Sequence, residues 1–509
     1  MSVIAGSIIA LHIILLAALS LFSLHRLSMV IRWLKYRNVK PPNKGEFRTL
    51  PLLTVQIPLY NERFVAKRII DACAALNYPA DKLQIQIVDD STDDTSDIVA
   101  REVEYQRSQG IDIVQVRREK RHGYKAGALK DAMETATGEF IAVFDADFIP
   151  PPDILIDNIG YFTDAEVGML QFRWGHLNRH SSPMTESQAM MLDAHFALEQ
   201  HVRCSSDKLL NFNGTAGVWR KETIYDSGNW SADTLTEDLD LSYRAQLVGW
   251  KMLYVNDVVC PGEIPADMNA FKSQQHRWAK GGTQVLLKLL KKVWKHPLPL
   301  RTKLESTFHL SNNLAYLVML TDTLFLLIPS LIIREYYDLA GKLWMDIALI
   351  LVASGGHLVY LFFGQVALGR SKTKALLYIP RLMLLGIQLA FNNARAALEA
   401  IAGHQSEFVR TPKSGERETQ VEQPVLLINN SDEKPEQALD ALDASAAYIA
   451  TVPNSVWVEL LAALTYTIVM GWALVNEVWV MVPYMLLLIF GFLSTAVDGM
   501  RSRVTPETS

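Results

Sequence analysis

The sequence predicts a membrane protein in two parts, an α/β domain with a mostly parallel sheet and an α-helical transmembrane domain. Three observations lead to this prediction. Half of the 509 residues are hydrophobic, which is too apolar for a wholly soluble chain of this length. Long apolar runs occur near the start and again after residue 300. Between them, short β-rich runs alternate with helical patterns.

The first apolar run predicts a transmembrane helix within residues 1–25. Residues 3–24 contain no Asp, Glu, Lys or Arg, and about 20 apolar residues suffice to cross a bilayer. Basic residues follow directly: Arg26, Arg32, Lys35 and Arg37. The positive-inside rule therefore places the N-terminus outside and the next segment in the cytosol. A cleaved signal peptide is the alternative, but no small-residue cleavage site closes the run.

Residues 46–300 predict the α/β domain. Buried strands that end in polar residues are expected at LLTVQIPLY (52–60), LQIQIVDD (83–90), IDIVQVRR (111–118) and EFIAVFDAD (139–147). Helical patterns such as ERFVAKRIIDACAAL separate them. This alternation predicts a ligand site where the carboxyl ends of the strands meet.

The second half predicts further membrane helices. Four stretches qualify by length and apolarity: 311–333, 344–368, 455–475 and 478–496. A fifth stretch, 374–402, has polar residues clustered toward one end, so we expect an interfacial or re-entrant helix there. The basic segment GRSKTK (369–374) favours the cytosol. The polar stretch 403–453, which includes an acidic linker, is expected in the cytosol together with the C-terminus.

Polar side chains gather where the predicted strands end. The first strand leads to Tyr60 and Glu62, and the second leads to Asp89 and Asp90, for which a solvated acidic turn is the alternative. A third end places Asp145 and Asp147 one residue apart. Because alternate side chains of an extended strand point the same way, both carboxylates can face one divalent cation. Mg²⁺ or Mn²⁺ commonly neutralises a diphosphate in this way.

Other candidate residues lie between and after these strands. Lys125 opens a helix in RHGYKAGALKDA, and a lysine beside helix N-terminal amides is a candidate phosphate contact. The glycines of FNGTAGVWR (212–220) allow the close approach of another backbone or a ligand. In TLTEDLDLSYRAQ, Thr236, Glu237 and Asp238 precede a helical pattern. Thr236 is a candidate helix cap, and a carboxylate within reach of a substrate would serve as a general base.

The segment TQVLLKLLKKVWKH predicts a basic amphipathic helix. Its apolar side holds Leu286, Leu287, Leu289, Leu290, Val293 and Trp294, and its basic side holds Lys288, Lys291, Lys292 and Lys295. This pattern is typical of a helix on an anionic membrane leaflet, and its place before a predicted spanning helix favours that location. An amphipathic core helix is the alternative.

Taken in order, these motifs resemble those of the inverting family 2 glycosyltransferases with the GT-A fold. The resemblance is closer to their processive membrane branch, the cellulose, hyaluronan, chitin and plant mannan or glucomannan synthases. The matching motifs are Asp89-Asp90, Asp145-Ala146-Asp147 (D-x-D), Thr236-Glu237-Asp238 (T-E-D) and Gln274-Gln275-His276-Arg277-Trp278 (Q-x-x-R-W). FNGTAGVWR is similar to the corresponding stretch of the plant mannan synthases. FVRTPK resembles the gating loop F-x-V-T-x-K through Phe408, Thr411 and Lys413, with Arg410 in place of valine.

The resemblance implies a Rossmann-like mixed sheet, amphipathic interface helices and a role for each motif. Tyr60, Glu62 and Asp89 would contact the nucleoside, and Lys125 and Arg277 would contact the diphosphate. Asp90 and Gln274 would also belong to the nucleotide-sugar site. Asp145 and Asp147 would hold nucleotide and metal. Asp238, within Thr236-Glu237-Asp238, would be the catalytic base, and Trp278 would bind the acceptor sugar together with Asn213, Gly214 and Thr215.

The implied function is polymerisation of a hexose into a β-linked polysaccharide that crosses the membrane. UDP-glucose is the first expected donor and GDP-mannose the second, with Mg²⁺ or Mn²⁺ as cofactor. Expected partners are the donor, the growing polysaccharide, the bilayer, and accessory export subunits or a second copy, but no nucleic acid. Transfer of one sugar to a lipid and a non-enzymatic transport conduit are the alternatives. The expected location is a plasma or inner membrane.

Overall fold

A seven-stranded sheet forms the centre of the α/β part of the computed structural model, which describes residues 1–339, 343–404, 415 and 456–501. The strand order is β3-β2-β1-β4-β6-β5-β7. β6 is antiparallel to both of its neighbours, and the remaining strands of this sheet share one direction. The strands are β1 (Leu53–Leu59), β2 (Leu83–Asp89), β3 (Ile113–Arg117), β4 (Phe140–Val143), β5 (Val167–His176), β6 (Gly217–Arg220) and β7 (Lys251–Gly262). The predicted α/β fold is confirmed, and β6 makes the sheet mixed.

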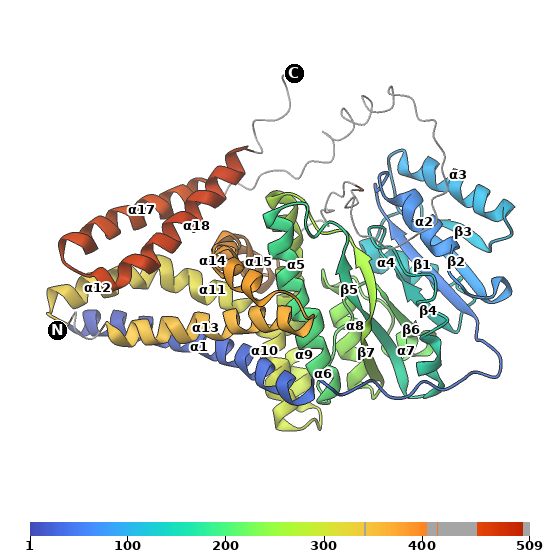
Figure 1. Cartoon of the computed structure of the whole chain (residues 1–509), viewed down its shortest axis with the longest axis horizontal. Helices are drawn as coiled ribbons and strands as arrows, with labels where there is room; N and C mark the ends of the chain where they lie inside the picture. Colours follow the sequence, from blue (N-terminus) through green and yellow to red (C-terminus); the bar gives the residue numbers. More distant parts are fainter. Residues whose placement is uncertain (340–342, 405–414, 416–455, 502–509) are drawn as a thin grey trace, which may run out of the picture.

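Helices cover both faces of this sheet, at the right in Figure 1. β4 shows how one strand serves two cores, because Phe140 and Ala142 pack with helices α2 and α3, whereas Ile141 and Val143 pack with α4 and α8. The helices of this part are α2 (Ala66–Ala74), α3 (Thr95–Ser108), α4 (Tyr124–Ala132), α5 (Pro183–Asp193), the π-helix η3 (Ala194–Gln200), α6 (His201–Ser205), α7 (Lys221–Asp226), α8 (Glu237–Leu247) and α9 (Met268–Lys295). Short 3-10 turns η1 (Ala80–Lys82) and η2 (Ile159–Thr163) complete it.

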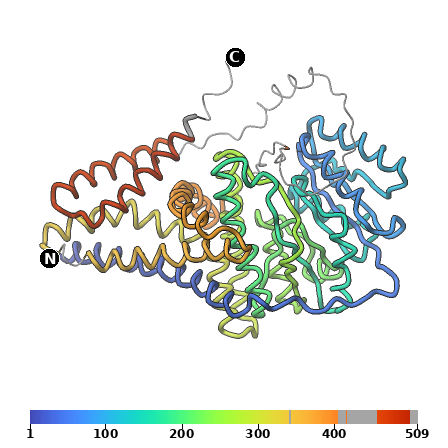
Figure 2. The backbone as a smooth tube through the Cα atoms, viewed as in Figure 1, coloured from blue at the N-terminus to red at the C-terminus, as the bar shows by residue number. Residues whose placement is uncertain are grey.

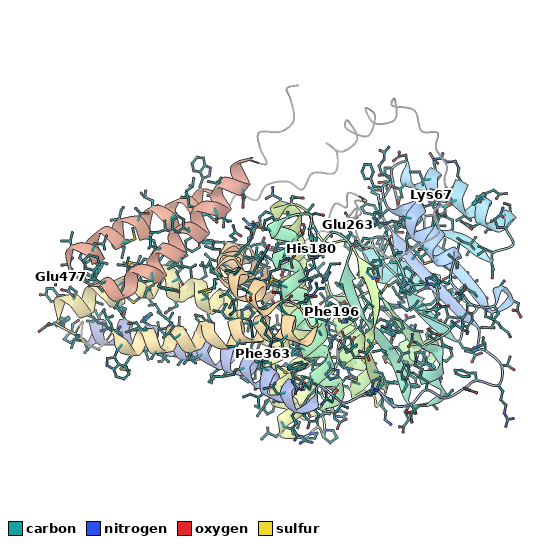
Figure 3. All side chains as sticks on the ribbon, in the orientation of Figure 1. Lys67, His180, Phe196, Glu263, Phe363 and Glu477 are labelled. Atoms are coloured by element: carbon teal, nitrogen blue, oxygen red, sulfur yellow. The ribbon has the colours of Figure 1, made fainter. Side chains whose placement is uncertain are left out.

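The other part of the molecule is a bundle of long helices that extends away from the sheet (Figures 1 and 2). Its helices are α1 (Val3–Tyr36), α10 (Leu300–Ser311), α11 (Leu314–Thr321), the π-helix η4 (Asp322–Leu326), α12 (Leu327–Tyr336), α13 (Trp344–Ala367), α14 (Lys372–Gln388), α15 (Ala390–Ile401), α17 (Val456–Val475), the 3-10 turn η7 (Trp479–Met481) and α18 (Val482–Arg501). Within the described residues, five helices are long and apolar enough to cross a membrane. Glu477, between α17 and η7, lies at the end of the bundle far from the sheet, whereas Lys67 lies on the sheet part (Figure 3).

The ends of some helices differ from the sequence prediction. α1 continues to Tyr36, well past residue 25, because charged side chains end an apolar run without ending a helix; Arg26 pairs with Glu199 of η3. The stretch 374–402 forms α14 and α15, which are inclined at 41° and count either as one broken span or as a re-entrant pair. The predicted linker and the gating-loop residues Phe408, Arg410, Thr411 and Lys413 lie outside the described residues.

Salt bridges hold the basic segment 369–374 against the sheet part. Arg370 lies 3.5 Å from Asp193 of α5, and Lys374 lies 2.8 Å from Glu186 of the same helix. The end of α13 and the start of α14 therefore lie on the side of the bundle that carries the sheet.

A buried polar cluster joins the two parts at η3. Glu199 is 2.5 Å from Arg26 of α1 and 2.5 Å from Arg203 of α6, and it accepts a hydrogen bond of 2.8 Å from the hydroxyl of Tyr360 in α13. Arg203 also pairs with Glu305 of α10 at 3.1 Å. Buried charges are costly unless they are paired and hydrogen-bonded, so this cluster fixes η3 to membrane-side helices from separate parts of the chain.

α9 corrects the prediction of a helix whose apolar side lies on the bilayer. Leu286, Leu289 and Val293 are buried inside the protein against Tyr243 of α8 and Leu310 of α10. From the predicted stripe, Leu287 and Trp294 are exposed. The amphipathic pattern alone does not distinguish a protein core from a lipid surface, because both environments remove the apolar side chains from water.

Candidate active site

A polar pocket opens beside the carboxyl ends of β1, β2 and β4, where the sequence predicts a ligand site. The sequence-predicted residues that line it are Tyr60, Glu62, Asp90, Lys125, Asp145, Asp147, Asn213, Gly214, Thr236, Glu237, Asp238, Gln274, Arg277 and Trp278. They come from the ends of three strands, the first turns of α4 and α8, the segment before β6, and α9. The fold therefore brings together residues separated by more than two hundred positions in the chain.

Lys125 is the centre of the hydrogen bonds in this pocket. Its ammonium group donates to Asp145 Oδ1 at 2.5 Å and to the carbonyl oxygen of Gly214 at 2.9 Å. Burial would lower the pKa of Lys125, but the carboxylates of Asp145 and Glu237 outweigh it and raise this pKa above its ordinary value. The site therefore holds a stable positive charge beside the carboxylate of Asp145.

Two partly buried carboxyl groups begin helix α8. Burial, reinforced by the neighbouring charge of Glu237, raises the pKa of Asp238 from 3.8 to about 7. Burial also raises the pKa of Glu237, against the attraction of Lys125. A carboxyl group with a pKa near neutrality is suited to accept a proton from a substrate hydroxyl.

Gly214 makes room for this carboxyl group. Its φ of +82° lies in the left-handed region, and a Cβ atom there would lie 3.1 Å from Asp238 Oδ2 and 3.5 Å from Lys125 Nζ. Both the backbone conformation and the close approach favour glycine at this position. The preceding Asn213 is held by Gln200 at 2.7 Å and His195 at 2.9 Å, both from η3.

Arg277 and Trp278 reach the pocket from α9. Burial lowers the pKa of Arg277, although the carboxylates of Glu237 and Asp145 act in the opposite direction; a guanidinium stays charged throughout the physiological range. The ring of Trp278 lies 6.5 Å from that of Trp174, at 55°. The pocket thus has a cationic wall beside an aromatic one.

An aromatic and charged group lies at the β1 side of the pocket. The guanidinium of Arg121 lies over the ring of Tyr60, 3.4 Å from its centre, a favourable cation–π geometry. Asp90 forms a two-point pair with Arg118 at 2.6 and 3.0 Å, and lies 3.8 Å from Arg121. This end combines a flat ring with groups that can donate and accept hydrogen bonds.

Asp89 and Thr215 do not line the pocket, and Thr236 does not make the predicted capping contact. Asp89 is buried and does not line the pocket, because its carboxylate accepts hydrogen bonds from the amide of Ser91 at 2.8 Å and from Gln115 at 2.7 Å. Thr215 is also buried, and its hydroxyl accepts a hydrogen bond of 2.8 Å from the amide of Asp145. Thr236 occupies the cap position of α8 without a capping hydrogen bond from its side chain.

Asp145 and Asp147 do line the same pocket, but not for the predicted reason. β4 ends at Val143, and Asp147 lies in a turn, so strand alternation does not orient the two side chains. Within the described residues no group of three or more His, Cys, Asp or Glu side chains is arranged to hold a metal ion. Two carboxylates suit Mg²⁺ or Mn²⁺ where a diphosphate supplies further oxygens.

Several lining residues were missed by the sequence analysis. Trp174 and His176 end β5, and Glu263 follows β7. Trp174 and His176 had a signal in the sequence, because FRWGH has the same form as the other strand ends, a hydrophobic run followed by polar groups. Arg121 lies four residues before Lys125 in a basic stretch, and nothing in the sequence distinguishes it from the neighbouring basic residues.

The mixed sheet, with a pocket of acidic, basic and aromatic groups at its strand ends, has the architecture of a GT-A glycosyltransferase domain. The mannosyltransferase PcManGT from Pyrobaculum calidifontis, solved in complex with GDP-Man and Mn²⁺, has this fold. It covers 78% of this chain and is itself covered completely, with a TM-score of 0.51 and 21% sequence identity.

Residues 51–281 match the family model described as "Glycosyltransferase like family 2". The chain is 40% identical over 268 residues to glucomannan 4-beta-mannosyltransferase 1 of Cyamopsis tetragonoloba, an alignment that covers 52% of this chain and 51% of the relative. It is 43% identical over 249 residues to glucomannan 4-beta-mannosyltransferase 2 of Arabidopsis thaliana, covering 48% and 46%. In these alignments the chain spans about half the length of the curated relatives. The resemblance to the plant mannan and glucomannan synthases is thereby confirmed.

Proposed function

We propose that this protein is a membrane-embedded inverting mannosyltransferase that uses GDP-mannose to extend a β-linked mannan or glucomannan chain. The observation that carries the proposal is the meeting of Asp238, Lys125 and Asp145 around Gly214 in one pocket. The names of the aligned relatives support a mannosyl donor. GDP-mannose, the second expected donor, therefore replaces UDP-glucose as the first choice.

Asp238 is the proposed general base. It takes the proton from an acceptor hydroxyl as that oxygen bonds to the anomeric carbon of the donor, while the bond from this carbon to the phosphate oxygen breaks. Attack from the side opposite to the leaving group converts an α-linked donor into a β-linked product. The amide of Leu239 donates to Asp238 Oδ1 at 2.8 Å, which orients the carboxylate so that Oδ2 faces Gly214.

Lys125 and Arg277 are the proposed contacts of the leaving nucleoside diphosphate. Negative charge develops on this group as the bond to the sugar breaks, and cations that are already in place stabilise it without reorganisation. The carboxylates of Asp145 and Asp147 would hold Mg²⁺ or Mn²⁺ together with the diphosphate. A bound cation would neutralise further charge on the phosphate oxygens.

The aromatic wall is the proposed acceptor site. Trp278, with Trp174 beside it, offers apolar ring faces on which a sugar can pack, and an indole N–H can donate a hydrogen bond to a hydroxyl. Asn213 faces the same pocket next to the base. At the other end, Tyr60 and Arg121 are proposed to contact the nucleoside.

We further propose that the sheet part and residues 369–374 lie in the cytosol, with the N-terminus on the other side of the membrane. The basic residues after the apolar run of α1 and the salt bridges of the 369–374 segment support this orientation. A cavity among α1, α11, α13, α14 and α18 contains polar side chains inside the bundle, including Arg26, Asn312, Asp322, Ser354 and His357. Such a cavity supports passage of the polymer.

The experiment is to offer the purified full chain, in nanodiscs, radiolabelled GDP-mannose or UDP-glucose with Mg²⁺ or Mn²⁺ and an oligomannoside primer. We expect incorporation from GDP-mannose into a long product that β-mannanase degrades. Incorporation from UDP-glucose alone would contradict the donor, and a short lipid-extractable product would favour the glycolipid alternative. No transfer from any donor, with GDP still bound, would contradict enzymatic activity and favour the conduit.

A further inference from the structure

α9 has a row of three residues that serves neither a lipid surface nor the pocket itself. Gly281, Gln284 and Lys288 are spaced by three and four residues, so they share one face of the helix. This face packs against residues 233–240, the segment that leads into α8 and carries the proposed base. Arg277 and Trp278 precede the row by one turn and line the pocket.

Each member of the row contacts this segment directly. Lys288 Nζ lies 2.7 Å from Asp233 Oδ1 and 2.8 Å from Asp240 Oδ1. The side-chain oxygen of Gln284 accepts a hydrogen bond of 2.9 Å from the amide of Leu235. A Cβ atom on Gly281 would lie 2.8 Å from the backbone nitrogen of Thr236.

We propose that Gly281, Gln284 and Lys288 are positioning residues for sugar transfer, which fix the turn before α8 and so place Asp238 against the acceptor hydroxyl. The proposal rests on the proposed function of Asp238 as the base. α9 also carries Arg277, which is proposed to bind the leaving diphosphate. The contacts of the row therefore hold Asp238 and Arg277 in a fixed position relative to each other.

The contacts are strong enough to hold the turn. Asp240 is fully buried and shared by Lys288 and Arg244, and removing one partner of a buried ion pair is costly. At Gly281 the obstacles are Cγ2, Oγ1 and the backbone nitrogen of Thr236, at 2.6, 2.7 and 2.8 Å from the added Cβ, and the backbone atom cannot swing aside as a long side chain does. A methyl group there must therefore displace the turn that leads to Asp238 by a few tenths of an ångström or more.

The test compares Gly281→Ala and Lys288→Met with matched controls on the same helix. Gly282→Ala places its methyl group near Asn313 Nδ2, the movable end of a side chain, and Lys291→Met removes an exposed lysine one turn along. Gln284→Ala adds no volume and probes the same link if Gly281→Ala yields little folded protein. The measurements are turnover at saturating GDP-mannose, the Kd for GDP, and the pH dependence of turnover.

We expect the row variants to lose about 10- to 100-fold in turnover, while their Kd for GDP stays within about twofold of the wild type. Opening the turn to water relieves the burial of Asp238, beside Glu237 of α8 and Lys125 of α4. The acid limb of the pH profile should therefore move to lower pH. Both controls should retain wild-type turnover and pH dependence.

Wild-type turnover and an unmoved acid limb in the row variants would overturn the proposal. Parallel loss of GDP binding and turnover would also overturn it, because that result indicates a general structural role. If the wild type transfers no sugar but binds GDP, the proposed function fails, and the pH dependence of the apparent Tm still reports whether Gly281→Ala changes the environment of Asp238.

Discussion

Replacing Asp238 by asparagine tests two consequences of one partly buried carboxyl group. Asparagine has nearly the same shape and can still accept the hydrogen bond from Leu239, but it cannot take up the proton of an acceptor hydroxyl. If Asp238 is the base, the variant should lose about 10²- to 10⁴-fold in sugar transfer. GDP should still bind, because Lys125 and Arg277 are unchanged.

The same substitution should stabilise the fold at neutral pH. The pKa of Asp238 is raised from 3.8 to about 7, a difference that corresponds to about 4 kcal/mol. For an acid whose pKa is higher in the folded state, the penalty is absent at low pH. It grows as pH rises from about 3.8 to about 7 and is constant above that. Asparagine removes this penalty, so the apparent Tm should rise at pH 8 and remain unchanged at pH 4.

The assay measures transfer from GDP-mannose and the apparent Tm of wild type and Asp238→Asn at both pH values. Glu237→Gln is a useful companion variant, because it removes the negative charge beside Asp238 and should lower the pKa of Asp238. The acid limb of its pH profile should therefore lie at lower pH than that of the wild type. Undiminished transfer by Asp238→Asn would refute the assignment of the base. A lower apparent Tm at pH 8 would refute the account of its pKa.

Three further changes probe the rest of the pocket. Gly214→Ala should cost about 1 to 2 kcal/mol of stability from its positive φ alone, and it should reduce turnover by crowding Asp238; thermal unfolding and initial rates measure both, and an unaffected Tm would contradict the backbone argument. Trp278→Ala should raise the KM for an oligomannoside primer several-fold with little effect on the Kd for GDP, whereas the reverse pattern would contradict an acceptor site. Chelation of divalent cations by EDTA should abolish transfer, and Mn²⁺ or Mg²⁺ should restore it in the wild type but poorly in Asp145→Asn; activity that persists in EDTA would contradict the proposed metal.

Much of the fold and part of the pocket could be predicted because local patterns determine them. The hydrophobic runs at 52–60, 83–90, 111–118 and 139–147 became four strands of the sheet, since buried parallel strands need continuous apolar sequence. Their carboxyl ends meet at one edge whatever the details of packing. The amino-acid sequence alone therefore suffices to place Tyr60, Asp90 and Asp145 in one pocket.

The remaining features depend on contacts that no local pattern encodes. Asp89 and Asp90 are adjacent acidic residues with different surroundings. Asp89 is buried and accepts a hydrogen bond from Gln115 of the neighbouring strand β3, whereas Asp90 lines the pocket and pairs with Arg118. In sequence, the lysines of α9 form a basic side that looks exposed. In the structure, Lys288 is paired with two aspartates, Asp233 before α8 and Asp240 within it. Such pairings depend on tertiary packing, which places residues about fifty positions apart against one another.

The cluster around Glu199 has a consequence for how the chain is made. Arg26 leaves the ribosome long before its partner, which follows 173 residues later, and Tyr360 of α13 comes later still. Until Glu199 is synthesised and its domain folds, the guanidinium of Arg26 needs water or lipid headgroups as a substitute. The complete cluster can therefore form only after both the sheet domain and α13 have been synthesised. A truncation that keeps the sheet domain without α1 and α13 should leave Glu199 short of two of its partners and assemble poorly.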